Sequence, residues 1–74
     1  MKVYPNPTSD IINFEYENIL DQDLLVQIIN YKGQVVFAKE QKISSVDVSD
    51  LSSGNYVLTI QSSDKFYSEK FIKK

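Results

Sequence analysis

The sequence predicts an all-β fold, an antiparallel sandwich of about seven short strands. In several short stretches apolar residues occupy every second position, as in strands that turn one face to a core. Turn-forming residues separate these stretches at short, fairly regular intervals. No stretch repeats its apolar residues with the period of a helix. Together these observations favour two small sheets packed face to face.

The length and composition of the chain are those of one small domain. It has 74 residues, of which 42% are apolar, and a net charge of −2. A chain of this size buries only about 60% of the surface of its unfolded state. We expect a single domain over residues 1–74, with an extended, proline-containing entry over 1–8 and the sandwich over 9–74. The opening residues lack the hydrophobic region of a signal peptide, so we expect an exported domain of this kind to travel within a larger chain.

The composition excludes several kinds of chemistry. Cys and His are absent, which removes disulfides and thiol chemistry, the usual zinc ligands, and the commonest base near neutral pH. All eight cations are Lys, so specific nucleic-acid binding is disfavoured. No apolar run is long enough to span a bilayer. We expect no cofactor, no metal and no catalytic residue.

The entry, Tyr4-Pro5-Asn6-Pro7, is expected to be extended. Each Pro fixes its own φ and moves the preceding residue away from helix. Two prolines allow this stretch to pair at most as an edge strand. It is predicted to be a stiff junction that leads into the domain.

The first alternating stretch runs from Asp10 to Glu17. Ile12, Phe14 and Tyr16 share one face, which predicts a half-buried strand. The next segment, 18–23, is predicted to be a solvated loop. Its two aspartates resemble the start of a calcium loop, but the other ligands and the glycine of such a loop are missing.

The most apolar stretch, Leu24 to Tyr31, is predicted to be a central strand. Alternation places Leu24, Val26 and Ile28 on one face and Leu25 and Ile29 on the other. Lys32-Gly33 then forms a tight turn, with Gly33 at the position that needs a positive φ.

The strand that returns from this turn covers residues 34–39. Both of its alternating sets are apolar, Val35 with Phe37 and Val36 with Ala38. Alternation therefore leaves open which set faces the core.

A corner follows, from Val46 to Ile60. Val46 and Val48 alternate with polar residues in one strand, and Tyr56, Leu58 and Ile60 alternate with others in the next.

Between these two strands, Leu51, Gly54 and Tyr56 form a Leu-x-x-Gly-x-Tyr pattern. It resembles the tyrosine corner of immunoglobulin-like sandwiches, in which the ring is buried and the hydroxyl bonds back to the corner's backbone. We therefore expect Leu51, Gly54 and Tyr56 to have a structural role in a sandwich of that type.

The last strand is predicted over residues 66–72, after a turn over 61–65. Alternation does not decide which set of its side chains faces the core, Phe66 with Ile72 or Tyr67 with Phe71. This end of the chain is basic, whereas the acidic residues of the first third (Asp10, Glu15, Glu17, Asp21 and Asp23) form an acidic cluster. The charges suit either a solvated edge or the attraction of a partner.

The order of the motifs resembles one known family. The entry comes first, then a strand followed by Asn30-x-x-Gly33, then the corner, and finally Lys70-Phe71-Ile72-Lys73. Over essentially the whole chain this is similar to the C-terminal sorting domain, type A, of proteins exported by the type IX secretion system of Bacteroidetes-type bacteria.

The resemblance implies that the domain is a sorting signal attached to a larger cargo protein. Its expected partners are the outer-membrane translocon or shuttle and a sortase-like protease, which usually removes the domain before Tyr4. The implied location is the periplasm in transit, then the cell surface or the medium. The implied recognition elements are the turn at Gly33 and the last strand, with residues Lys70, Phe71, Ile72, Lys73 and Lys74. A terminal edge strand also suits pairing with a partner's sheet, or a dimer formed by edge strands.

An alternative function is a small immunoglobulin-like adhesion or carbohydrate-binding module. It rests on the aromatic residues, nine in all, which are too many for so small a core. Exposed Tyr31 and Tyr67 would then stack on sugars or fill a partner's pocket.

Overall fold

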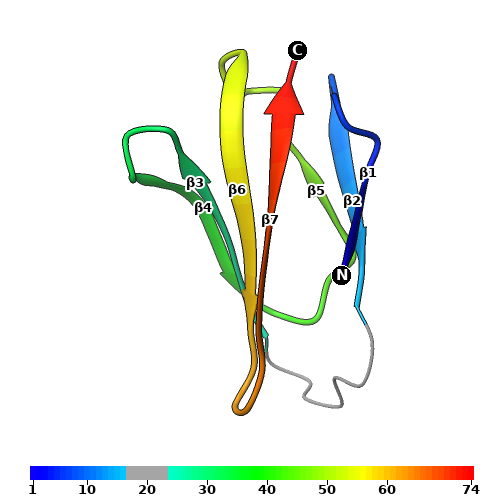
Figure 1. Cartoon of the computed structure of the whole chain (residues 1–74), viewed down its shortest axis with the longest axis vertical. Helices are drawn as coiled ribbons and strands as arrows, with labels where there is room; N and C mark the ends of the chain where they lie inside the picture. The colour runs from blue at the N-terminus through cyan, green and yellow to red at the C-terminus, as the bar shows by residue number, and fades with distance from the viewer. Residues whose placement is uncertain (17–23) are drawn as a thin grey trace.

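The computed structural model describes residues 1–16 and 24–74 as a sandwich of two antiparallel sheets (Figure 1). Their seven strands are β1 (Lys2–Tyr4), β2 (Ile11–Glu15), β3 (Leu25–Asn30), β4 (Val35–Glu40), β5 (Ser45–Asp47), β6 (Gly54–Gln61) and β7 (Phe66–Lys73). The all-β sandwich predicted from the sequence is thus confirmed. The described residues contain no helix that is long and apolar enough to cross a membrane.

The smaller sheet has the order β1-β2-β5. The entry takes part in it, since Val3 of β1 lies opposite Phe14 of β2. On the other side of β2, Ile12 lies opposite Val46 of β5. β1 is therefore an edge strand of this sheet, and the two prolines of the entry follow it in the sequence.

The larger sheet has the order β4-β3-β6-β7 and pairs every strand antiparallel to its neighbours. The predicted central strand, β3, lies between β4 and β6. The polar segment before β7 is the predicted turn, in which the backbone N–H of Ser62 donates to the carbonyl of Lys65 at 2.9 Å. β4 and β7 are the two edges of this sheet.

The core lies between the sheets and follows the predicted alternation in β2, β3 and β6. Its fully or almost fully buried members are Ile12, Phe14, Leu24, Val26, Ile28, Val46, Val48, Tyr56, Leu58, Ile60 and Phe71. Burying one such side chain contributes about 1.5–3 kcal/mol. Tyr16, on the same face as Phe14, is partly buried, and its hydroxyl donates to the carbonyl of Ile43 at 3.1 Å.

The structure shows which side chains of β4 face the core, a point that the sequence left undecided. Phe37 packs against the core, whereas Val35 is exposed. A bulge shifts the register here, because Ile28 lies opposite Phe37 while the next residue, Ile29, lies opposite Val35. Val36 is the extra residue, and the regular alternation assumed for this strand is interrupted.

The structure also shows which side chains of β7 face the core. Tyr67 and Phe71 face the core, and Phe66 and Ile72 face solvent. Tyr67 is therefore not the freely exposed ring that the carbohydrate-binding alternative expected. Glu17 and the loop expected over 18–23, with its two aspartates, lie outside the described residues.

Candidate functional site

The predicted recognition elements lie at one end of the sandwich. The turn between β3 and β4, the corner between β5 and β6, and the last residues of β7 are all at the upper end of Figure 1. Sequence positions far apart thus meet at one surface.

The hairpin turn is built around Asn30. Its side-chain Oδ1 accepts hydrogen bonds from the backbone N–H groups of Lys32 at 2.9 Å and Gln34 at 3.0 Å. The N–H of Gly33 donates to the carbonyl of Asn30 at 2.9 Å. Gly33 has φ +82°, the left-handed region that glycine adopts without steric cost, so the predicted positive φ is confirmed.

The last five residues alternate between the core and the surface. Phe71 is buried, and Lys73 is nearly so, with its Nζ donating to the carbonyl of Lys74 at 3.1 Å. Lys70, Ile72 and Lys74 are exposed. Three of the five predicted recognition residues are thus accessible, and the other two hold the strand against the core.

The entry is hydrogen-bonded to the end of β7. The side-chain Oδ1 of Asn6 accepts from the backbone N–H of Ile72 at 2.9 Å. The N–H of Thr8 donates to the carbonyl of Ile72 at 2.9 Å, and the N–H of Lys74 donates to the carbonyl of Thr8 at 2.8 Å. We call these three bonds the entry clasp. They satisfy backbone groups at the edge of β7 that would otherwise be left without a strand partner.

Thr8 is the residue of this clasp that sequence reasoning missed. It is 1% exposed, and its hydroxyl donates to the carbonyl of Ile11. A threonine after Asn6-Pro7 is interpreted as a linker residue, because its backbone partners, Ile72 and Lys74, lie 64 and 66 positions further along the chain. No local pattern in the sequence indicates that this side chain is buried.

The corner has the geometry expected of a tyrosine corner. The hydroxyl of Tyr56 donates to the carbonyl of Ser52 at 2.6 Å, while its ring is buried. Leu51 packs against the core from the turn, and its N–H donates to the carbonyl of Val48 at 3.0 Å. Gly54 has φ +154°, a conformation that side chains resist.

The corner is also joined to the last strand. The rings of Tyr56 and Phe71 stack with their centroids 5.6 Å apart and their planes inclined by 20°. Such a contact adds about 0.5–1.5 kcal/mol to the burial of the two rings. The corner therefore supports the position of β7 as well as its own turn.

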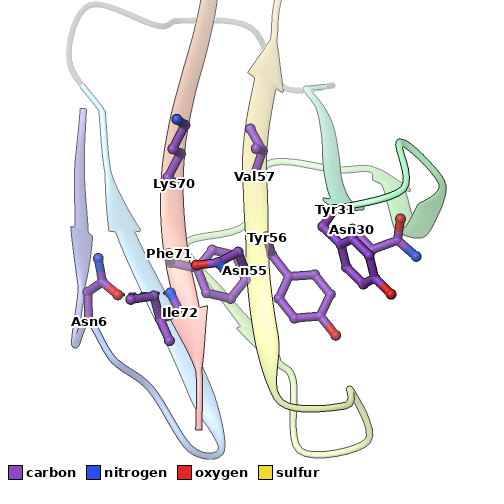
Figure 2. A pocket seen from close by; sticks show the side chains of 9 residues that line it. All are labelled: Asn6, Asn30, Tyr31, Asn55, Tyr56, Val57, Lys70, Phe71 and Ile72. Carbon is purple, nitrogen blue, oxygen red and sulfur yellow. Dashed lines mark hydrogen bonds between the residues drawn. The ribbon is translucent and has the colours of Figure 1, made fainter.

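A shallow pocket of about 370 Å³ lies across this end of the larger sheet (Figure 2). Figure 2 shows Asn6 and Ile72 on one side, Tyr31 on the other side, and Asn55 between Ile72 and Tyr31. The lining residues come from the entry, β3, β6 and β7, and are Asn6, Asn30, Tyr31, Asn55, Tyr56, Val57, Lys70, Phe71 and Ile72. Asn55 was not singled out in the sequence, where it lies between Gly54 and Tyr56 as an ordinary turn residue.

The titratable groups with shifted pKa values serve the fold. The side chain and the backbone N–H of Ser49 hydrogen-bond the carboxylate of Asp47 and lower its pKa. The carboxylate of Glu15 beside the hydroxyl of Tyr4 raises the pKa of that phenol. Among residues 1–16 and 24–74 no group of three acidic, His or Cys side chains is arranged to hold a metal ion.

Comparison with known proteins gives one family and two named relatives. Residues 2–74 match the family described as the secretion system C-terminal sorting domain. An ulvan lyase, NLR42, of Nonlabens ulvanivorans is 34% identical over 74 residues, which are 95% of this chain and 14% of that protein. Beta-agarase D of Zobellia galactanivorans is 32% identical over 60 residues, which are 81% of this chain and 12% of that protein. The chain thus spans a small part of each relative.

Proposed function

The chain belongs to the secretion system C-terminal sorting domain family, and from this premise we propose that the outer-membrane translocon of the type IX system reads it at the end of the sandwich that carries Gly33 and Lys70–Lys74. Domains of this family direct a larger cargo protein across the outer membrane. The proposal concerns which residues carry that signal and how the fold presents them.

The observation that carries the proposal is the entry clasp. It holds the backbone of Ile72 and Lys74 through Asn6 and Thr8, so the last residues of an edge strand have a fixed position. A partner that binds an ordered strand loses less conformational entropy than one that must order it. The clasp therefore favours a role for Lys70, Ile72 and Lys74 as a preformed recognition element.

The buried residues of this element act through the fold. Phe71 anchors the strand by its stack on Tyr56, and Lys73 places its aliphatic part in the interior. Gly33 shapes the hairpin turn at the same end. In this proposal their replacement weakens export by displacing the surface that the translocon contacts.

Removal of the domain by a sortase-like protease belongs to the same proposal. The family resemblance implies a cut before Tyr4, but Lys2, Val3 and Tyr4 are paired with β2 in this sheet. A protease requires an extended, unpaired segment, so we place the cut upstream of Lys2 or after local opening of β1. The cargo would then be released at the cell surface or joined to it.

Both named relatives are enzymes by name, an ulvan lyase and a beta-agarase. This favours an enzyme as the cargo of the present domain. Assay of the complete secreted protein on ulvan and on agar tests that part of the proposal. If the protein acts on neither polysaccharide, the inference of an enzyme cargo from these relatives loses its support.

The recognition element is tested with a fluorescent protein that carries an inner-membrane signal peptide and residues 3–74. In a type IX-competent host we expect the fusion at the surface, and a fusion without residues 70–74 in the periplasm. Lys74→Glu should lower export, whereas Lys39→Glu on exposed β4 is the charge-matched control. Equal export of these two variants, with equal melting temperatures, would refute a role for the last residues.

A further inference from the structure

The outer face of the larger sheet carries a contiguous row of apolar side chains. Core residues alternate with outward-facing ones, so the neighbours of buried Ile28, Leu58 and Phe71 lie on the outer face of the sheet. Residues directly opposite one another in antiparallel strands have side chains on the same face. The register places Val35 opposite Ile29, Ile29 opposite Val57, and Val57 opposite Lys70, and in the adjacent row it places Asn55 opposite Ile72.

We call Ile29, Tyr31, Val35, Val57 and Ile72 the outer apolar strip. It crosses all four strands at the end where Gly33 and the last residues lie. Tyr31 is 77% exposed, and Val35 and Ile72 are about half exposed. A polar row, Gln27 with Thr59 and Ser68, bounds the strip toward the other end of the sheet. Isolated exposed apolar residues are ordinary on protein surfaces, but a bounded, contiguous set marks a contact surface.

Three residues of this strip, Tyr31, Val57 and Ile72, line the pocket of about 370 Å³. Figure 2 shows Ile72 and Tyr31 on opposite sides of it, with Val57 and Lys70 toward its upper end. Its volume is within the range of about 300–1,000 Å³ of ligand-binding pockets. An anchoring side chain of a partner would fit between Tyr31 and Ile72, in the way that interface hot spots are filled.

The charged side chain that lines the pocket is a cation, whereas the whole chain has a net negative charge. Lys70 lines the pocket, and Nζ of Lys32 lies 5.8 Å from the centroid of the Tyr31 ring. No carboxylate is among the described residues that line the pocket. The net charge of −2 is carried elsewhere, for example by Glu15 and Asp47 on the smaller sheet. A partner with acidic groups at its rim complements this face.

The polar groups of the pocket favour a protein partner over a sugar. Both hydrogen-bonding atoms of the Asn30 amide are used within the hairpin, since Oδ1 accepts from two backbone N–H groups and Nδ2 donates to Gln34. Oδ1 of Asn6 accepts from the backbone of Ile72. These amides serve the fold, and the apolar side chains of the strip are left as the exposed surface.

Resting on the proposed function, we propose that the outer apolar strip is the docking surface for a component of the export machinery whose contact area is apolar at its centre and acidic at its rim. Tyr31 and Ile72 are the anchoring residues, and Lys70 and Lys32 pair with the acidic rim. This adds Tyr31, Val57 and the outer face of β3 to a recognition element so far limited to the hairpin turn and the last strand.

The test compares matched replacements in the same fluorescent fusion and type IX-competent host. Ile72→Ser is paired with Ile11→Ser, because the two isoleucines are 47% and 43% exposed on opposite sheets. Tyr31→Ser is paired with Phe66→Ser, an exposed aromatic on the same face beyond the polar row. We expect Ile72→Ser and Tyr31→Ser to lower the exported fraction about tenfold, the effect of removing an interface anchor, and both controls to leave it unchanged.

Two charge variants of Lys70 test the same surface independently, in case a serine variant lowers the stability of the domain. Lys70→Glu should lower export while Lys70→Arg preserves it, and the melting temperature of the isolated domain should be the same in both. Equal export of Lys70→Glu and Lys70→Arg would overturn the acidic rim, and equal export within both matched pairs would overturn the docking surface. Retention of the unaltered fusion in the periplasm would overturn the proposed function itself. Shifts of the Asn55 and Tyr31 resonances on addition of maltohexaose, with export unaffected by the variants, would assign this face to a glycan.

Discussion

Replacing Tyr56 with Phe isolates the hydrogen bond that closes the corner. The variant keeps the buried ring and its stack on Phe71, and it removes only the hydroxyl that donates to the carbonyl of Ser52 at 2.6 Å. A hydrogen bond of this kind contributes about 0.5–1.5 kcal/mol net. Ser52 is exposed, so water can replace the lost donor and the larger cost of an unsatisfied buried carbonyl does not arise.

The expected loss is therefore about 1 kcal/mol in the free energy of unfolding. In a domain of this size that corresponds to a fall of about 4–8 °C in melting temperature. Urea unfolding followed by circular dichroism measures it as a lower midpoint with an unchanged slope. Tyr31→Phe is the control, because the exposed hydroxyl of Tyr31 should contribute nothing measurable. Equal midpoints for the two variants would refute the structural role given to the corner.

Gly54→Val should cost about 1–3 kcal/mol because of its φ of +154°, since the space around the new Cβ is open; calorimetry showing an unchanged melting temperature would contradict this. Phe71→Ala should cost about 3–5 kcal/mol and Phe66→Ala almost nothing, because only Phe71 is buried; similar urea midpoints would contradict the assigned face of β7. Asp47→Asn tests the pKa of Asp47, which is lowered below 3.8 by the hydrogen bonds from Ser49. The folded state holds that proton less tightly than the unfolded state, so Asp47 stabilises the fold above pH 3.8 and this contribution is lost as the pH falls through the lower folded pKa. The difference between wild type and Asp47→Asn, measured by unfolding from pH 6 to pH 2, should shrink at the acid end; a constant difference would exclude this origin.

The sequence predicted those elements in which a single alternating set is apolar. In β2 the alternation placed Ile12 and Phe14 correctly on the buried face, and in β6 the spacing of Gly54 and Tyr56 identified the corner. These predictions succeed because one buried face and one polar face leave only one register that keeps apolar side chains out of water.

Alternation could not predict which faces of β4 and β7 are buried. Both sets in each strand are apolar, and edge strands bury little of either. In β4 a bulge at Val36 also interrupts the alternation of inward and outward side chains. The local composition gives no sign of this bulge. Contact with Tyr56 decides the face of β7, and that partner comes from a different strand.

The entry clasp and the outer apolar strip are products of topology. The bond from Ile72 to Asn6 joins residues 66 positions apart, and the strip assembles single residues from four strands. The recognition residues proposed from the family resemblance all lie in local motifs. Tyr31 and Val57 belong to no such motif, and only the strand order brings them beside Ile72.

The central claim is that this domain is a sufficient export signal read by the type IX translocon. The most direct measurement is surface fluorescence of the fusion carrying residues 3–74, compared between a type IX-competent host and an otherwise identical host that lacks the translocon. We predict fluorescence at the surface of the first host and in the periplasm of the second. The same location in both hosts, whether surface or periplasm, would contradict the claim.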